Sequence, residues 1–560
     1  MAYFHGIKTT ETPSGLLPAA QIESGLVFAV GTAPIHLATK KIPANKPILC
    51  YNYSEFVEQL GSSSDFEKYT LSEVAYSQWQ LFNVAPTVFV NVLDPAKHYT
   101  EFTELKYGAS NNPVTLTGDI FLESVKVSSK KIEKQSLIKD TDYTATITTT
   151  TQGDVTTIDI IIGATLPSDE VEISYANGGN NFSIEKKVSD LPFDLPVNST
   201  DVNVKAIVEI VNEFVLNQDY TADFNSKNEV EINILSPGKI FNDTIEVNYR
   251  QVAPEKVTAA DIIGGYDVQT GKNTGLECIE DVFPRFRLTP GIIIAPKFST
   301  DVTVAAIMKA KCQNINSVFN CVAICDIPTD EIKNYTDAAE YKNSKNLIDK
   351  NLIVCYPKIS LGGVQYHLST QLASLMNQVD TESGGGIPYI SPSNHRLQMD
   401  SCCLEDGTEI FYSLDQANYL NGNGIVTALN FANGWTAWGN RDSIYPSSTD
   451  PSENFIPIRR MGLFLRNQVI LTFWSKVDGP INRRLIESIS DSYQLYLNGL
   501  AARGALLPGA RIEFRSSDNP TTDLISGVVK FKVYDSPAPP AEAIIFDFEF
   551  DPSVFESLFE

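Results

Sequence analysis

Two stretches of the chain alternate largely apolar runs with segments of helical spacing. Residues 25–31 and 87–93 have the near-continuous apolar character of strands that are buried on both faces. Between them, residues 54–60 and 71–82 have helical spacing, and Ser54 is the expected N-cap of the first helix. The alternation resumes later, with strand-like runs at 291–296, 318–324 and 351–355 and helix-like segments at 300–314 and 328–347. This pattern predicts a mostly parallel or mixed sheet with crossover helices.

The segment between these two stretches has a different pattern. Apolar and polar residues alternate with a period of two at 155–160 and 230–234, β-branched residues are frequent, and Gly, Asn and Pro interrupt the runs. Such a pattern is typical of short antiparallel strands.

The same segment contains a weak internal repeat. Asp142–Ala145 (DYTA) recurs as Asp219–Ala222, 77 positions later, and residues 169–175 recur in similar form at 243–249, 74 positions later. The repeat predicts two small β-sandwich-like modules, one after the other along the chain.

The two ends of the chain differ from domain cores. Residues 1–24 carry too little apolar surface to pack alone, and residues 536–540 (SPAPP) form a stiff extended spacer. After the spacer, alternation places four large apolar side chains on one face of a strand: Ile544, Phe546, Phe548 and Phe550. Such a strand needs a sheet edge, either in its own domain or in a neighbouring subunit, and the pattern leaves both open.

Together these patterns predict a multidomain fold of the α+β or α/β class, with a mixed-sheet core, a β-sandwich-like insertion and extended arms at both ends. The predicted parts are an N-terminal arm (1–24), a discontinuous α/β core (25–110 and 253–445), two insertion modules (111–178 and 179–252), a C-terminal domain (446–535) and a C-terminal arm (536–560).

Composition and charge exclude several classes of function. The 560 residues carry a net charge of −25, which argues against a nucleic-acid or anionic-membrane binder, because both need clustered Lys and Arg. No window has the roughly 18 consecutive apolar residues of a membrane span, and residues 1–15 lack the apolar stretch of a secretory signal. Eight cysteines are too sparse for a disulfide scaffold, and we expect reduced thiols in the core.

Charge is unevenly distributed along the chain. Residues 111–250 contain 22 acidic and 11 basic side chains, whereas residues 456–515 contain nine basic and four acidic ones. In the basic block, five arginines lie within or beside two predicted helices at 457–475 and 480–503: Arg459, Arg460, Arg483, Arg484 and Arg503. The second helix has a candidate buried face formed by Leu485, Ile489, Leu495, Leu497 and Leu500. The arginines could meet an acidic partner, or form local salt bridges with Glu487 and Asp491.

The sequence offers no catalytic constellation, no metal site and no cofactor site. Residues 265–273 resemble a phosphate-binding loop, but five residues separate the glycines and Asn273 replaces the required Ser or Thr, so a turn is the better interpretation. The five histidines are scattered, and the cysteines lack a second pair at zinc spacing. A nucleotide-driven motor is therefore a less favoured alternative. A cell-surface adhesin is also less favoured, because residues 1–15 lack a secretory signal and the predicted core is α/β.

Short strings spread over the chain, in a shared order, resemble the FI-type tail sheath proteins of contractile bacteriophages. They are Tyr3–Ile7 (YFHGI), Val30–Pro34 (VGTAP), Asp261–Gly265 (DIIGG), Thr270–Leu276 (TGKNTGL), Ser391–Asn394 (SPSN), Leu420–Ile425 (LNGNGI), Trp438–Arg441 (WGNR), Ile458–Arg460 (IRR), Asp478–Pro480 (DGP) and Ser536–Pro540 (SPAPP). The resemblance covers about 1–100 and 255–560, and the acidic β segment lies outside it.

The resemblance implies a structural protein without catalysis or cofactor. It implies self-assembly into stacked hexameric rings around an inner tail tube protein, contact with baseplate and tail terminator proteins, and contraction that drives the tube through the host envelope during genome delivery. It places the protein in the virion, assembled in the host cytoplasm, with no nucleic-acid or membrane partner. The alternative within this class is the sheath of a phage-derived injection device, such as a tailocin or extracellular injection system.

The resemblance also implies roles for particular residues. Terminal arms of sheath subunits exchange strands with neighbouring subunits, which assigns this role to Tyr3, Phe4 and Ile7 and to Ile544, Phe546, Phe548 and Phe550. The C-terminal domain of the family faces the tube, which makes the five arginines of the basic block candidate tube contacts.

Overall fold

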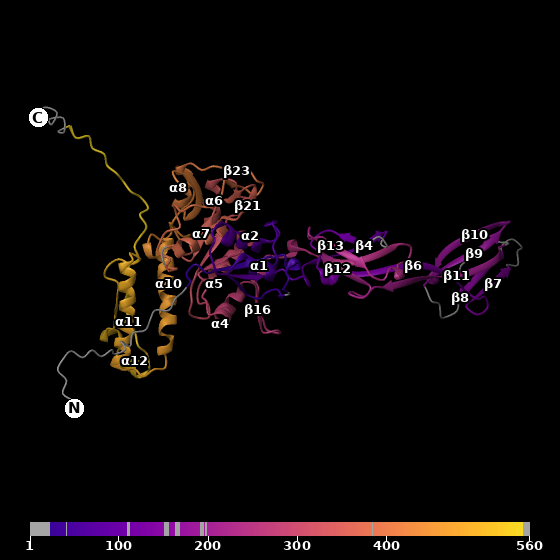
Figure 1. Ribbon diagram of the computed structural model, residues 1–560, viewed down its shortest axis with the longest axis horizontal. Coiled ribbons are helices and arrows are strands. Elements are labelled where there is room, and N and C mark those ends of the chain that lie inside the picture. Colours follow the sequence, from indigo (N-terminus) through magenta and orange to yellow (C-terminus); the bar gives the residue numbers. More distant parts are fainter. Residues whose placement is uncertain are drawn as a thin grey trace, which may run out of the picture. The chain divides into compact units, whose positions relative to one another are not determined.

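The computed structural model describes residues 23–40, 42–108, 113–149, 156–162, 169–190, 195–196, 199–382 and 385–552. The chain divides into two compact units (Figure 1). Unit 1 is formed by the chain up to His98 and from Pro254 onward, and unit 2 is Tyr99–Ala253. No helix in the described ranges is both long and apolar enough to cross a bilayer.

An eight-stranded mixed sheet forms the centre of unit 1. In spatial order its strands are β2 (Ile48–Cys50), β3 (Thr87–Asn91), β1 (Val27–Gly31), β17 (Ile292–Ile294), β18 (Val322–Asp326), β19 (Leu352–Cys355), β24 (Ile425–Phe431) and β25 (Gly434–Trp438). The six inner strands run parallel and the two edge strands are antiparallel to their neighbours. The predicted mixed sheet is confirmed, because strands buried on both faces leave long apolar runs in the sequence.

Crossover helices connect these strands. They include α1 (Tyr53–Leu60), α2 (Thr70–Tyr76), α5 (Val302–Lys311), α6 (Tyr335–Ser344), α7 (Leu368–Glu382) and α8 (Leu414–Gly422). Side chains of α1, α2 and α7 share one core with β1, β3, β17, β18 and β19. The predicted cap of the first helix is wrong by two residues, since Asn52 accepts the Glu55 amide proton at 2.9 Å.

Several short elements complete this part of unit 1. A second sheet has the order β21 (Val364–Tyr366), β20 (Lys358–Leu361), β22 (Ser401–Cys403) and β23 (Glu409–Ile410). The segment that resembles a phosphate loop is a hairpin of β15 (Gly265–Asp267) and β16 (Lys272–Thr274). Its turn is closed by Asp267, whose carboxylate accepts hydrogen bonds from Gln269 and Thr270. All eight cysteines are buried and unpaired.

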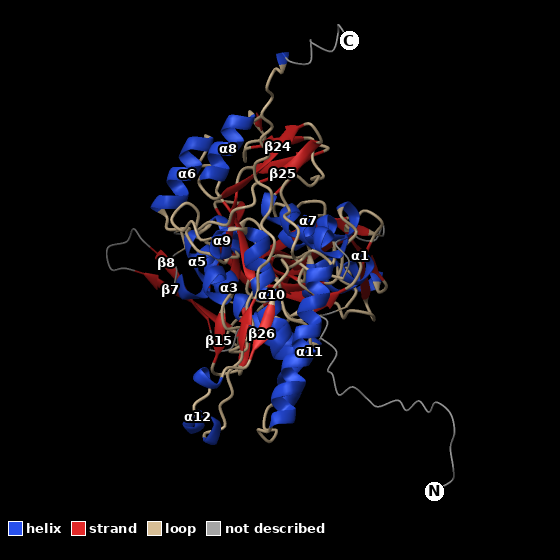
Figure 2. Cartoon of the chain, turned by 90° about the vertical axis from the view of Figure 1, so that its left-hand side faces the viewer, coloured by secondary structure: helices blue, strands red, loops and turns tan. Residues whose placement is uncertain are grey.

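The basic block forms two long helices that lie beside each other (Figure 2), α10 (Ile456–Phe473) and α11 (Arg483–Ala502). Met461 and Phe464 of α10 share a core with Tyr493 and Leu497 of α11. The predicted buried face of α11 is wrong at Leu495, which is 59% exposed, because two helical residues turn the side chain about 200° away from Leu497. After α11 come β26 (Arg511–Glu513), α12 (Thr521–Ile525) and β27 (Lys532–Tyr534).

Unit 2 consists of β-sheets. A six-stranded sheet has the order β10 (Asn180–Lys187), β9 (Glu170–Asn177), β11 (Thr200–Glu213), β6 (Lys126–Ser136), β14 (Thr244–Val252) and β4 (Tyr99–Tyr107). A three-stranded sheet contains β12 (Tyr220–Phe224), β13 (Val230–Ile234) and β5 (Val114–Leu116), and a hairpin contains β7 (Tyr143–Thr149) and β8 (Thr156–Ile162). The unit begins at Tyr99 and not at residue 111, because β4 pairs with β14 along its whole length.

The prediction of two consecutive modules within this segment is wrong, although the internal repeat is real. Strand β6 of the first repeat lies between β11 and β14 of the second. Phe214 donates its amide proton to the Val127 carbonyl, and Leu137 donates to Val204, both at 3.0 Å. Each of these residues is 77 positions from its counterpart, so the two repeats exchange their long strands reciprocally.

The recurring DYTA string has a structural explanation. In each copy the aspartate, Asp142 or Asp219, accepts an amide proton from the preceding turn. The tyrosine that follows donates its hydroxyl proton to the other repeat's long strand: Tyr143 to Val202, and Tyr220 to Val125. The string therefore couples one repeat's turn to the other repeat's strand, and each of the two cores contains residues from both repeats.

Replacing Tyr220 with Phe tests this coupling. The change leaves the buried Val125 carbonyl without its hydroxyl partner, and we expect the free energy of unfolding of unit 2 to fall by about 1–2 kcal/mol. Tyr143→Phe should have an effect of the same sign, whereas Tyr107→Phe, at a side chain that is 77% exposed, should have almost none. Denaturant unfolding of the full chain measures this, and equal stability of Tyr220→Phe and Tyr107→Phe would contradict the coupling.

Candidate assembly site

The C-terminal arm presents an apolar face that is exposed among the described residues. Residues 536–552 run out from unit 1 as extended chain without strand pairing from 538 onward (Figure 1). The four apolar residues of the predicted strand are 72% to 91% exposed: Ile544, Phe546, Phe548 and Phe550. Burying such side chains is favourable by about 1.5–3 kcal/mol each. The predicted N-terminal exchange residues, Tyr3, Phe4 and Ile7, lie outside the described residues.

Unit 1 also has a short sheet with a free edge. Strands β26 and β27 pair over three residues, and within the described ranges neither has a second partner strand. A two-stranded sheet is marginally stable on its own. On the β26 side the Ile512 amide already donates to Gln494 Oε1 at 3.1 Å, so the outer edge of β27 is the edge that presents backbone donors and acceptors to an added strand. The ribbon can therefore accept an added strand.

Arg441 holds the root of the C-terminal arm, by which we mean the segment around Glu542 where the arm leaves unit 1. Arg441 donates from Nε to Glu542 Oε1 at 3.1 Å and from its terminal nitrogens to Glu542 Oε2 and Asn454 Oδ1. The guanidinium carbon lies 3.8 Å from the centre of the Phe455 ring and 4.5 Å from that of Tyr445. The bidentate ion pair between Arg441 and Glu542 fixes Glu542 at the point where the arm leaves unit 1.

Four of the strings that resemble the sheath family meet at this root. A surface hollow of about 560 Å³ is lined by residues from 391–394, 421–422 and 438–440, together with Pro540 to Glu542. Gly424 has φ +67°, and a Cβ there would lie 2.5 Å from the Tyr445 carbonyl oxygen. The Gly and Asn content of these strings thus allows the close backbone approach on which the root is built.

The N-terminal side of the chain has a similar root. Arg460 donates to both carboxylate oxygens of Asp380, at 3.0 and 2.6 Å, and to the Ser24 carbonyl at 3.2 Å. The Ser24 hydroxyl donates to Asp380 at 2.7 Å and to the Gly386 carbonyl. Arg460 is only 4% exposed, so its prediction as a tube contact is wrong. The sequence could not show this, because Asp380 is 80 positions away.

The other four arginines differ in their surroundings. Arg459 is partly buried, donates from Nε to Asn351 Oδ1 at 2.8 Å, and has a pKa lowered by burial. The Arg483 side chain is 91% exposed and pairs with Glu487 one helical turn later, which is the local salt bridge considered as the alternative. Arg484 and Arg503 are exposed. Of the five candidates, Arg483, Arg484 and Arg503 are accessible.

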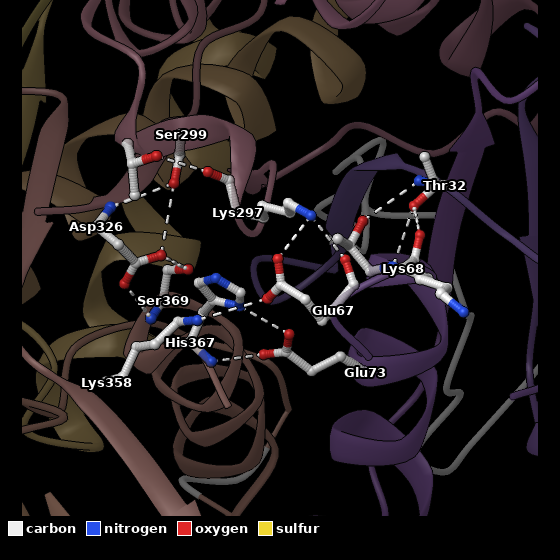
Figure 3. A network of polar contacts seen from close by, with 12 residues as sticks. Thr32, Glu67, Lys68, Glu73, Lys297, Ser299, Asp326, Lys358, His367 and Ser369 are labelled. Atoms are coloured by element: carbon white, nitrogen blue, oxygen red, sulfur yellow. Dashed lines mark hydrogen bonds and ion pairs between the residues drawn. The ribbon is translucent and has the colours of Figure 1, made fainter. Parts of the chain in front are cut away.

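A buried polar network lies at the carboxyl end of the central sheet (Figure 3). Asp326, at the end of β18, accepts the Ser369 amide proton at 2.9 Å and also the Ser369 hydroxyl proton. His367 Nδ1 lies 2.8 Å from Glu73 Oε2. At the solvent-exposed border of the network, Lys297 pairs with Glu67 at 2.6 Å. The Ser369 hydroxyl donates to the Asp326 carboxylate and not to the His367 imidazole. The contacts join Ser369 of α7 to Asp326 of β18, and His367 to Glu73 of α2, so the network attaches α2 and α7 to the sheet.

Comparison with known proteins identifies the class to which this architecture is related. The chain is 23% identical to the tail sheath protein of Burkholderia phage BcepMu over 569 aligned positions, which cover 98% of this chain and 96% of that protein. It is 26% identical over 310 residues to a prophage major tail sheath protein of Pseudomonas aeruginosa UCBPP-PA14, covering 53% of this chain and 74% of that protein. The chain is similar to tail sheath proteins of phage and prophage origin. No protein-family model matches it.

A solved structure supports a sheath-type fold. The helical sheath protein of the anti-feeding prophage in its contracted state superposes with a TM-score of 0.50 at 12% identity, covering 98% of this chain and all of that chain. The resemblance to sheath proteins inferred from short strings is thereby confirmed. What the strings did not reveal is the role of Arg441, although its position in the WGNR string was the available signal.

The buried network makes stability dependent on pH. Burial lowers the pKa of His367, but the adjacent Glu73 carboxylate more than offsets this and raises the pKa above 6.5. The folded state therefore keeps a proton that the unfolded chain loses, so the stabilisation is complete below pH 6.5 and is lost as the pH rises through the folded value. Burial also raises the pKa of Asp326, which acts in the same direction.

We expect the free energy of unfolding to decrease above pH 6.5 by up to about 1.4 kcal/mol per pH unit for one proton. His367→Gln should make this slope shallower than in the wild type but not abolish it, because burial raises the pKa of Asp442 to about 9 and its proton contributes with the same sign. His395→Gln, at a half-buried histidine of the same unit, should leave the slope unchanged. Denaturant midpoints measured between pH 6 and 9 check this, and an equal slope in wild type and His367→Gln would refute the assignment.

Proposed function

We propose that this chain is the structural subunit of a contractile tail sheath, which polymerises around an inner tube and shortens to drive the tube through a host envelope during genome delivery. The observation that carries the proposal is an extended arm that is held at Glu542 and whose large apolar side chains are exposed among the described residues. The full-length similarity to a phage tail sheath protein supports the same conclusion.

The proposed assembly is a stack of hexameric rings, with baseplate and tail terminator proteins at its two ends. In a virion these rings are assembled in the host cytoplasm. The work of contraction needs no nucleotide, because a few kcal/mol released by each of many subunits sums to a large driving force, and the extended state is held kinetically. A phage-derived injection device is the second candidate, favoured by the fold similarity to the anti-feeding prophage sheath.

Strand addition between copies is the proposed link. The arm strand at 544–550 adds to an open edge of the β26–β27 ribbon of a neighbouring copy, with its apolar face turned inward. Main-chain pairing suits a contractile lattice, since its hydrogen bonds persist while the domains that they join rotate as rigid bodies.

Electron microscopy of the purified full-length protein in negative stain tests the function itself. We expect long, striated, hollow cylinders. A preparation that stays monomeric at all protein concentrations, with and without tube protein, would contradict the sheath assignment.

Replacing Phe546, Phe548 and Phe550 together with Ser tests the arm. We expect the cylinders to be lost, because the added strand no longer buries an apolar face, while the free energy of unfolding of the monomer is unchanged, since these side chains are exposed there. The matched control, Asp547→Asn with Glu549→Gln, changes the opposite face of the same strand and should still assemble. Normal cylinders from the triple variant would argue against strand addition through this face.

The accessible arginines are the proposed tube contacts, and Arg483→Glu with Arg484→Glu tests them. Reversed charge at an acidic tube wall should give sheaths that form only contracted or without tube. Reversal of two exposed lysines elsewhere in unit 1, Lys333→Glu with Lys345→Glu, is the control. Tails of normal extended length from the arginine variant, seen in the microscope, would remove this role.

A further inference from the structure

Arg441 is held by contacts that do not involve the arm. Its side chain is only 14% exposed, lies between the Phe455 and Tyr445 rings, and donates to Asn454 Oδ1 at 2.6 Å. Asn454 and Phe455 directly precede α10, and Tyr445 lies ten positions before Phe455. The remaining donors of the guanidinium face Glu542, so the core presents a preformed receptor for one carboxylate.

Arg460 forms the same kind of pair at the other end of the chain, independently of Arg441. Both ion pairs are bidentate. The Arg460–Asp380 pair binds Ser24, where the chain enters the core, and the Arg441–Glu542 pair lies where the chain leaves it. They differ in burial: the side chains of Arg460 and Asp380 are 4% and 1% exposed, whereas Glu542 is 46% exposed. Water and salt ions therefore reach the C-terminal pair and not the N-terminal one.

We propose that Arg460 and Arg441 are the positioning residues of the two arms, Arg460 as a permanent anchor and Arg441 as an anchor that can release Glu542 and bind it again. This inference rests on the proposed function, in which both arms connect neighbouring copies. A pull on residues 544–550 then passes through Glu542 and Arg441 into the start of α10 and the end of β25, and not into residues 535–541, which connect β27 to Glu542.

The releasable anchor allows the C-terminal arm to change direction. During contraction the neighbouring copies move, and an arm held by an exposed ion pair can reorient about Glu542 without loss of its strand pairing. The N-terminal anchor keeps the entry of the chain into β1 fixed at the same time, because Ser24 is bound by both members of the buried pair.

A nitroxide spin label next to each root tests the inference on the full-length monomer. All eight native cysteines are buried, so a label on Ala543→Cys or on Glu23→Cys attaches selectively. At low ionic strength we expect an immobilised electron paramagnetic resonance spectrum at position 543. Raising the salt to about 1 M, where the Debye length is about 3 Å, should convert it to a mobile spectrum, and the label at position 23 should stay immobile.

Glu542→Gln is the central variant. At low salt it should give the mobile spectrum at position 543, and Asp547→Asn, which removes the same charge from the same arm, should not. In an Arg441→Lys background the added Glu542→Gln change should have little further effect, because both members of one pair are then altered. Identical spectra for Glu542→Gln and Asp547→Asn would overturn the anchor at Arg441, and a salt-mobilised label at position 23 would overturn the permanent anchor at Arg460.

The assembled state gives a second readout. Sheaths of Glu542→Gln should form but break into ring fragments on contraction, with a fragmented fraction severalfold above that of Asp547→Asn in electron micrographs. Equal fragmentation would contradict a mechanical role. Failure of the wild type to form cylinders would count against the proposed function alone, since the monomer spectra do not depend on assembly.

Discussion

A β-strand is stable only when both its backbone hydrogen-bonding groups and its apolar face are covered. In the described part of the chain the C-terminal arm meets neither condition, because residues 544–550 lie outside every strand and their apolar side chains are exposed. This exposed segment links the fold to the proposed function. A strand whose apolar face and backbone groups are uncovered in one copy can be covered by pairing with a sheet edge of a second copy. In the proposed sheath, the same pairing repeated from copy to copy produces a lattice around the tube.

The rest of unit 1 provides a rigid base for the arms. The mixed sheet and its helices form one continuous core, and the buried network of Asp326, Ser369, His367 and Glu73 attaches α2 and α7 to the ends of the strands. Each arm root is held by an arginine whose geometry is set by that core. Unit 2 applies the same physical principle within one chain, because its two repeats complete each other's sheets by exchanging long strands.

Local patterns were sufficient to predict the inner strands β1, β3, β17, β18 and β19 and the helices between them, but not α7, α8, β24, β25 or the second sheet. Non-local pairing explains where the predictions were wrong. Apolar runs such as 87–93 mark buried strands whatever their neighbours are. The order of strands in unit 2 depends on contacts between β6 and β11, which no local pattern specifies. Nothing in the local sequence distinguishes Arg460 from an exposed arginine. It is buried because it pairs with Asp380, which is 80 positions away in the sequence. Arg441 lay in a string that the resemblance singled out, but its partner Glu542 is 101 positions later.

The central claim is that the arms, and not the compact core, connect the subunits. The most direct measurement is electron microscopy of a chain trimmed to residues 23–542, which keeps both arginine anchors and loses both free ends. We expect a folded monomer that forms no cylinders at concentrations where the full chain assembles completely. Intact cylinders of the trimmed chain that contract as the full-length ones do would contradict the claim.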